Sequence, residues 1–321
     1  MRIRGILIML ALAAGGCGDD TTTSGMDMAT VADMAVPDLA VGATASRGEE
    51  LVKHLLFCGS CHTTPDANGN PSTDPADFLA GGKLFTVNAG GDGGTVTVYA
   101  PNLTPDDATG TGMWTSSMIA DAVVVGVDND GAPLWPTMPY QRFAAMTRDD
   151  AESIGLYIKS LPPKSHAVPE DSAHPTLAGT AFDYTTFPHT TLAATDPAFA
   201  SAERGRYLAT LGCLQCHTPS GGGPAGLDVS KAYAGGRSFG GGLKSANLTP
   251  DATGLSGWTI ADIVATLKTD KEKGTGVTLS TTMPGGADGF GGLTDPDLND
   301  LAEFVQTLPP VMNGPFLHPD M

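Results

Sequence analysis

The sequence predicts a mainly helical protein that contains two tandem copies of one small domain. The first observation is an internal repeat: a cysteine–histidine motif, an Asn-Leu-Thr-Pro motif, a Thr-Met-Pro motif and a Leu-Pro-Pro motif each occur twice in the same order. The second is that helix start and stop signals recur in both copies, whereas alternating strand patterns are weak. The third is the length of 321 residues, which fits about two domains.

The repeat also defines the domain boundaries. Cys58 matches Cys213 at an offset of 155, and Met138 matches Met283 at an offset of 145. The offset falls because the first copy holds extra residues around 87–99, where a Gly-rich turn predicts a short β-hairpin. We therefore expect a first domain at 46–165, a linker at 166–195, a second domain at 196–312 and a tail at 313–321.

Several helix ends can be located from single residues. Serine and threonine side chains cap helix N-termini, because their oxygen accepts a backbone N–H that has no partner inside the helix. The last helix of each copy is expected to end before Leu-Pro-Pro, since proline cannot continue it. The predicted N-caps, the first as part of a capping box, are Ser46, Thr115, Thr147, Thr259 and Thr294.

Residues 1–17 predict an export signal. Arg2 and Arg4 precede nine apolar residues, which are too few to span a bilayer. Small residues then precede Cys17, as in bacterial lipoprotein signals, so we expect Cys17 to be lipidated; an ordinary signal peptide with an incidental cysteine is the alternative. Residues 18–45 lack aromatics and predict a disordered tether. The protein is thus expected to be exported and anchored by its lipid, on the periplasmic side of a membrane or at the cell surface.

The charge restricts the class of partner. The chain has 35 acidic and 17 basic residues, for a formal net charge of −18. Such a surface repels nucleic acid and favours basic partners through long-range electrostatics. We therefore expect no nucleic-acid binding.

Each copy contains a motif typical of covalent haem attachment. Two cysteines three positions apart can form thioethers with the two vinyl groups at one porphyrin edge, and the histidine that follows then lies beneath the iron as an axial ligand. Disulfides within each motif, or one zinc ion shared by the four thiolates, are the alternatives. Two covalently bound haem c groups are predicted, at Cys58, Cys61 and His62, and at Cys213, Cys216 and His217.

Methionines are the candidates for the opposite side of each iron. Met138 and Met283 occupy the same repeat position before a proline, and the soft thioether suits haem iron. A methionine can instead be a flexible filler of gaps. Met113, Met118 and Met146 have no counterparts in the second copy, and we expect them in the core.

Other polar residues are predicted to have structural roles. His54 is expected on an exposed helix surface, and the histidines of the linker are poor candidates for iron ligands. Asn102 and Asn247 match a glycosylation acceptor pattern, but inside a repeated motif they are expected to brace a loop by hydrogen bonds.

Taken together, the motifs resemble the cytochrome c subunits of membrane-bound alcohol and sugar-acid dehydrogenases. The first copy carries CGSCH, NLTPDDATG, MWT and TMPY, and the second carries CLQCH, NLTPDATG, GWT and TMPGG. The resemblance implies two class-I-type cytochrome c domains. It also implies that a glycine of the first helix packs against an aromatic residue of the last helix; here the pairs are Gly48 with Tyr157 and Gly205 with Phe304.

A function as an electron carrier follows from these expectations. With His and Met on both irons, neither haem offers a substrate site, so the protein would carry single electrons between redox partners rather than act as an enzyme. The resemblance implies a dehydrogenase as partner, and a terminal oxidase or reductase is the other option; the family usually holds three haems, whereas this chain has two motifs. The alternative is a di-haem enzyme of the peroxidase or thiosulfate-oxidising type with one labile ligand, for which no acid–base group or spare cysteine is evident.

Overall fold

The structure is a computed structural model that describes residues 42–88, 94–175 and 181–314. The predicted signal, Cys17 and nearly all of the tether lie outside these ranges, as does most of the tail. None of the helices in the described part of the chain is long and apolar enough to cross a membrane.

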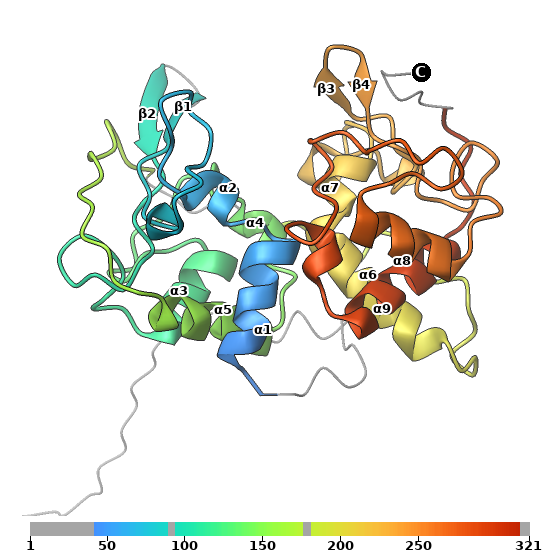
Figure 1. Cartoon of the computed structure of the whole chain (residues 1–321), viewed down its shortest axis with the longest axis horizontal. Helices are drawn as coiled ribbons and strands as arrows, with labels where there is room; N and C mark the ends of the chain where they lie inside the picture. Colours follow the sequence, from blue (N-terminus) through green and yellow to red (C-terminus); the bar gives the residue numbers. More distant parts are fainter. Residues whose placement is uncertain (1–41, 89–93, 176–180, 315–321) are drawn as a thin grey trace, which may run out of the picture.

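Helices dominate both repeats, as predicted. In the first repeat the elements are α1 (Ala45–Glu50), the π-helical η2 (Leu51–Leu55), α2 (Gly59–His62), η3 (Pro75–Asp77), β1 (Leu84–Asn88), β2 (Thr95–Tyr99), α3 (Ser116–Val124), α4 (Tyr140–Phe143) and α5 (Arg148–Ser160). In the second they are α6 (Phe199–Gly212), α7 (Leu214–His217), η5 (Pro224–Gly226), η6 (Val229–Lys231), β3 (Ser238–Gly240), β4 (Leu243–Lys244), α8 (Ile260–Thr269), η7 (Phe290–Gly292) and α9 (Asp295–Gln306). The repeats lie side by side, the first in blue and green and the second in yellow to red (Figure 1).

The first and last helices of each repeat cross at a glycine. A Cβ added at Gly48 would lie 1.8 Å from a backbone carbonyl oxygen of α5 and 2.8 Å from the Cβ of Tyr157. At Gly205 the corresponding distances are also 1.8 Å, to a carbonyl oxygen of α9, and 2.8 Å, to the Cβ of Phe304. Only glycine allows the two backbones to approach this closely, and both predicted glycine–aromatic pairs are confirmed.

Most of the predicted helix caps are present, but the first one is shifted. The Thr44 hydroxyl, not that of Ser46, accepts the Arg47 backbone N–H at 3.1 Å, so the first helix begins at Ala45. Thr44 has the extended backbone of an N-cap, whereas Ser46 lies inside the helix. The confirmed N-caps are Thr115, Thr147, Thr259 and Thr294.

A β-hairpin occurs in both repeats, although it was predicted only for the first. Strands β1 and β2 pair antiparallel over five residues each, from Leu84 opposite Tyr99 to Asn88 opposite Thr95. In the second repeat β3 and β4 form a shorter antiparallel pair of three and two residues. The extra residues of the first repeat therefore lengthen a hairpin that both repeats have, and both hairpins project at the top of Figure 1.

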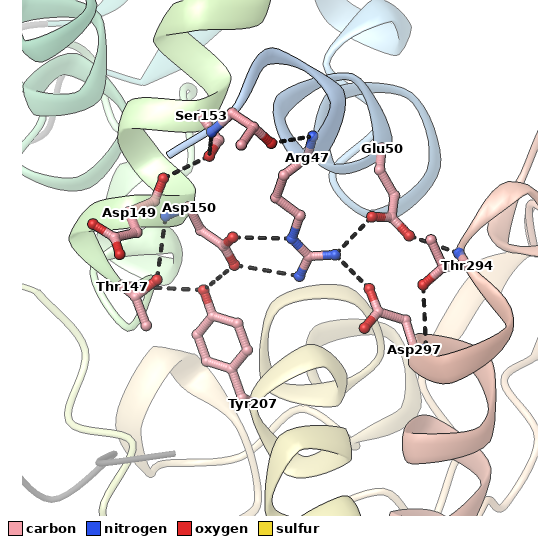
Figure 2. A network of polar contacts seen from close by, with 10 residues as sticks. Arg47, Glu50, Thr147, Asp149, Asp150, Ser153, Tyr207, Thr294 and Asp297 are labelled. Atoms are coloured by element: carbon pink, nitrogen blue, oxygen red, sulfur yellow. Dashed lines mark hydrogen bonds and ion pairs between the residues drawn. The ribbon is translucent and has the colours of Figure 1, made fainter. Parts of the chain in front are cut away.

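A polar network joins the two repeats (Figure 2). Arg47 of α1 donates from Nε to Asp150 at 3.0 Å and from Nη1 to Glu50 at 2.8 Å, and it also pairs with Asp297 of α9. Burial opposes the charge of Arg47, but Asp150, Asp297 and Glu50 together raise its pKa. Burial also raises the pKa of Asp297, to about 6, against the charge of Arg47 and with help from Glu50. Three carboxylates thus surround a single cation at this point of contact.

Each repeat also caps the last helix of the other (Figure 2). The Tyr207 hydroxyl donates to Asp150 at 2.7 Å and accepts the backbone N–H of Thr147, the N-cap of α5, at 3.2 Å. Glu50 accepts the backbone N–H of Thr294, the N-cap of α9, at 2.6 Å. Tyr207 and Glu50 each stand two residues after the crossing glycine of their own repeat. These reciprocal contacts hold the two repeats in one arrangement.

Candidate functional site

The cysteine–histidine motifs lie at the end of the first helix of each repeat, on the short helices α2 and α7. The four cysteines are free, so no disulfide forms within either motif. Burial raises the pKa of both Cys58 and Cys213 to about 12, which keeps them as neutral thiols at pH 7. Among the residues that the structure describes, no group of three or more His, Cys, Asp or Glu side chains is arranged to hold a metal ion. The disulfide and shared-zinc alternatives therefore find no support.

Both motif histidines are buried and oriented by a backbone carbonyl. The Nδ1 atom of His62 lies 3.0 Å from the carbonyl oxygen of Pro101, and that of His217 lies 2.8 Å from the carbonyl oxygen of Ala246. Because a carbonyl only accepts, Nδ1 carries the proton, and the lone pair of Nε2 is left free for a metal. Burial lowers the pKa of both imidazoles, which keeps them neutral.

The repeated Ala-Gly-Gly motif fixes the backbone of the same histidines. The N–H of Gly81 donates to the His62 carbonyl at 2.6 Å, and that of Gly235 donates to the His217 carbonyl at 2.7 Å. Both glycines have a positive φ, of 77° and 71°. A Cβ at either position would lie within 2.5 Å of backbone atoms of the segment that supplies the carbonyl for Nδ1. The motif therefore locks each histidine against that segment.

The repeated asparagines brace the next loop, as predicted. Asn102 is 3% exposed; its Oδ1 accepts two hydrogen bonds from Thr104, and its Nδ2 donates to the Lys164 carbonyl at 2.9 Å. Asn247 makes the equivalent bonds, including one of 2.8 Å to the Val311 carbonyl. Each asparagine thereby ties the loop beside the histidine to the chain that follows the last helix.

In the second repeat the predicted residues surround one cavity. Cys213, Cys216, His217 and Met283 all line a space of about 380 Å³, within the range of roughly 300–1,000 Å³ typical of small-molecule and cofactor sites. The remaining wall is mostly apolar and includes Leu248, Leu255, Ile263, Leu267, Leu301 and Val305. Two thiols and an imidazole on one side, a thioether and aliphatic side chains elsewhere, fit a large apolar group fastened by thioether bonds.

The two Met-Pro loops have the same backbone turn. In both, the methionine N–H donates to the carbonyl three residues earlier, at 3.0 Å for Met138 and 2.7 Å for Met283. The methionine carbonyl then accepts the N–H two residues later, at 2.8 Å and 2.9 Å respectively. Both side chains are half-buried and pack against the hydrophobic core. For the first site, this equivalence of the loops is what supports Met138 as the counterpart of Met283.

Three expectations about other residues need correction. His54 is half-buried, not an exposed surface residue, because its Nδ1 lies 3.0 Å from the carbonyl oxygen of Gly289 in the second repeat. Met113 and Met118 are exposed (76% and 37%) and do not belong to the core, whereas Met146 is buried as expected. The Met118 sulfur instead accepts the backbone N–H at the N-cap of α3, at 3.5 Å.

Sequence analysis missed the contribution of the first repeat to the second cavity. Its side chains there are Leu55, Leu56, Phe57, Ser60 and Arg142. The ring of Phe57 meets that of Phe290 edge to face, with the centroids 5.0 Å apart. One signal was available in the sequence. Phe57 and Arg142 align with Gly212 and Ala287, so the two copies differ in side-chain size and charge at positions where the first repeat faces the second.

Comparisons with known proteins show similarity to cytochromes c. Residues 202–309 match the cytochrome c family. The chain is 29% identical to a diheme cytochrome c-type protein of Cereibacter sphaeroides, over 86% of this chain and 90% of that protein. It is 30% identical to the cytochrome c subunit of a quinone alcohol dehydrogenase of Gluconobacter oxydans, over 87% of this chain and 57% of that subunit. A fructose dehydrogenase cytochrome subunit of Gluconobacter japonicus is 33% identical over 38% of this chain.

The coverage differs among these relatives. The chain aligns with nearly all of the diheme protein but with little more than half of the alcohol dehydrogenase subunits. All of them are cytochromes or cytochrome subunits by description, and the family match coincides with the repeat whose cavity is lined by Cys213, Cys216 and His217. The sites and the comparisons together support the function of an electron-transfer cytochrome that binds haem c covalently.

Proposed function

We propose that the protein is a di-haem c-type cytochrome with two tandem cytochrome c domains, at 46–165 and 196–312, which carries single electrons between redox partners. The observation that carries this proposal is the geometry of the second site. There a buried histidine with its Nε2 lone pair free shares one cavity with two free cysteines and Met283. The matching hydrogen bonds of His62 and of the Met138 loop support a second site of the same kind in the first repeat.

The chain's own residues fix the redox properties of such sites. A bound haem c supplies a one-electron iron couple. The cysteines would hold it covalently, the carbonyls of Pro101 and Ala246 keep the imidazoles of His62 and His217 neutral and oriented, and the apolar wall of the second cavity would exclude water. Met138 and Met283 would supply thioether ligands to the two irons, which would favour a relatively high potential. Unequal loops after the two methionines, Tyr140 against Gly285, favour unequal potentials.

Anchoring and partner complete the proposal. Lipidation of Cys17 would hold the protein at a membrane, on its periplasmic side or at the cell surface. The relatives described as cytochrome subunits of dehydrogenases favour a dehydrogenase as the electron donor. A net charge of −18 favours a docking partner with a basic surface.

Intact mass of the exported holoprotein tests the two attachment sites. The wild type should carry two covalent haems. Substituting alanine for Cys58 and Cys61 together should remove one haem, and substituting Cys213 and Cys216 should remove the other. As a matched control, Cys17→Ala should keep both haems and lose only membrane association. A wild type with one covalent haem or none would refute the proposal.

A further inference from the structure

Arg142 belongs to the first repeat but lies at the second site. It stands on α4, four residues after Met138, and its side chain lines the cavity that also contains Cys216 and His217. The aligned residue of the second repeat is Ala287, so the arginine has no symmetric counterpart.

The guanidinium of Arg142 lacks an anionic partner among the described residues. Its Nε is fully buried and has no hydrogen-bond partner there, and none of the carboxylates in the described ranges forms an ion pair with it. The guanidinium carbon lies 5.0 Å from the centroid of the Phe143 ring. This is unusual in a chain with 35 acidic and 17 basic residues, because a buried charge normally has a partner of opposite charge.

The surroundings of Arg142 point to the haem pair. Burial lowers the pKa of Arg142, and the other groups in electrostatic range are Tyr184, Cys216, Arg237 and Cys61. Cys61 and Cys216 come from different attachment motifs, and of these two Cys216 lines the same cavity as Arg142. The Tyr184 hydroxyl is likewise buried and has no hydrogen-bond partner among the described residues. The unpartnered Nε of Arg142, on a side chain that lines the cavity, indicates that a polar acceptor of the bound group completes the site.

We propose that Arg142 binds a carboxylate of the haem in the second repeat. Haem c carries two propionate carboxylates, and the planar guanidinium fork matches a carboxylate better than any other cationic side chain does. The inference rests on the proposed function, because it requires haem at Cys213 and Cys216. Arg142 is thus a positioning residue: it holds the carboxylate ionised and adds positive charge beside the second haem, which favours the reduced iron. The second site is complete only when the first repeat is docked against it.

Redox titration of the full-length holoprotein tests this assignment. The variants are Arg142→Gln and Arg142→Lys, with Arg148→Gln as a control that removes the same charge from the half-exposed surface of α5. Met138→His and Met283→His, which replace the proposed axial ligands, assign each midpoint potential to a haem. In Arg142→Gln the midpoint potential of the second haem should fall by about 59 mV, which corresponds to a tenfold shift of the one-electron equilibrium toward the oxidised state. Its midpoint should also become more dependent on pH between 5 and 7, as the carboxylate loses its partner.

The outcomes separate the assignment from the proposed function. Arg142→Lys should lower the same midpoint potential by less, since lysine keeps the positive charge but lacks the planar guanidinium. This variant still tests the assignment if Arg142→Gln does not fold. Three outcomes would each overturn the assignment. The first is unchanged midpoint potentials in both Arg142 variants, and the second is an equal shift in Arg148→Gln. The third is a fall in the midpoint potential of the first haem, which is the one that Met138→His displaces. Failure of the proposed function would appear in the wild type itself, as fewer than two covalent haems.

Discussion

The crossing of α6 and α9 at Gly205 supports a sharp test by substitution of alanine. The added Cβ would lie 1.8 Å from the carbonyl oxygen of Asp300, whereas a carbon–oxygen contact needs about 3.2 Å, so the helices must separate by more than 1 Å. Alanine is favoured over glycine inside a helix by about 1 kcal/mol, and overpacking costs about 1–3 kcal/mol or more. Because the clash is with backbone and no side chain can move aside, we expect an overpacking cost at the upper end of this range and a net destabilisation of about 2 kcal/mol.

Chemical denaturation followed by circular dichroism measures this effect. Gly222→Ala is the matched control, since a Cβ at Gly222 would meet no atom within 4 Å. The midpoint of unfolding should fall for Gly205→Ala and stay close to the wild type for Gly222→Ala. Equal midpoints for the two variants would refute the argument that a close helix crossing supports the attachment site.

Two further predictions concern the network between the repeats. Tyr207→Phe should destabilise the protein by about 2 kcal/mol, because Asp150 and the Thr147 N–H lose their buried partner. A double-mutant cycle with Asp150→Asn measures the coupling energy between the two side chains. Additive effects of the two substitutions would contradict the contact. Asp297 has a pKa raised to about 6 in the folded protein, so its contribution to stability is complete below its unfolded pKa near 4 and is lost as pH rises through 6. Asp297→Asn should therefore flatten the decline in unfolding free energy between pH 4 and 7, and a profile parallel to the wild type would refute the shift.

The chemistry that could be predicted from the sequence is local or repeated. A cysteine–histidine motif carries its function within five residues, and an N-cap within four. The recurrence of Met-Pro in both copies singled out Met138 and Met283 among 12 methionines. The crossing glycines were found through a family resemblance, since no local pattern marks Gly48 or Gly205 as a contact.

The features that could not be predicted depend on how the repeats pack. The carbonyls that orient His62 and His217 belong to the backbone, so the residue types at Pro101 and Ala246 do not indicate which carbonyls accept these hydrogen bonds. His54 was assigned to the surface from its position four residues before Cys58. Local sequence does not reveal that the second repeat supplies the carbonyl of Gly289 as its partner. Arg142 looks like an ordinary surface arginine until the fold places it beside Cys216.

The proposed function requires that both irons have a histidine and a methionine as fixed axial ligands. Its most direct test is an optical spectrum of the purified holoprotein, first oxidised, then reduced with dithionite and finally exposed to carbon monoxide. We expect a near-red charge-transfer band in the oxidised form, sharp c-type bands after reduction, and no change with carbon monoxide. Ready binding of carbon monoxide at one haem would contradict it, because that site would then have an open or labile position and an enzymatic function would have to replace simple electron transfer.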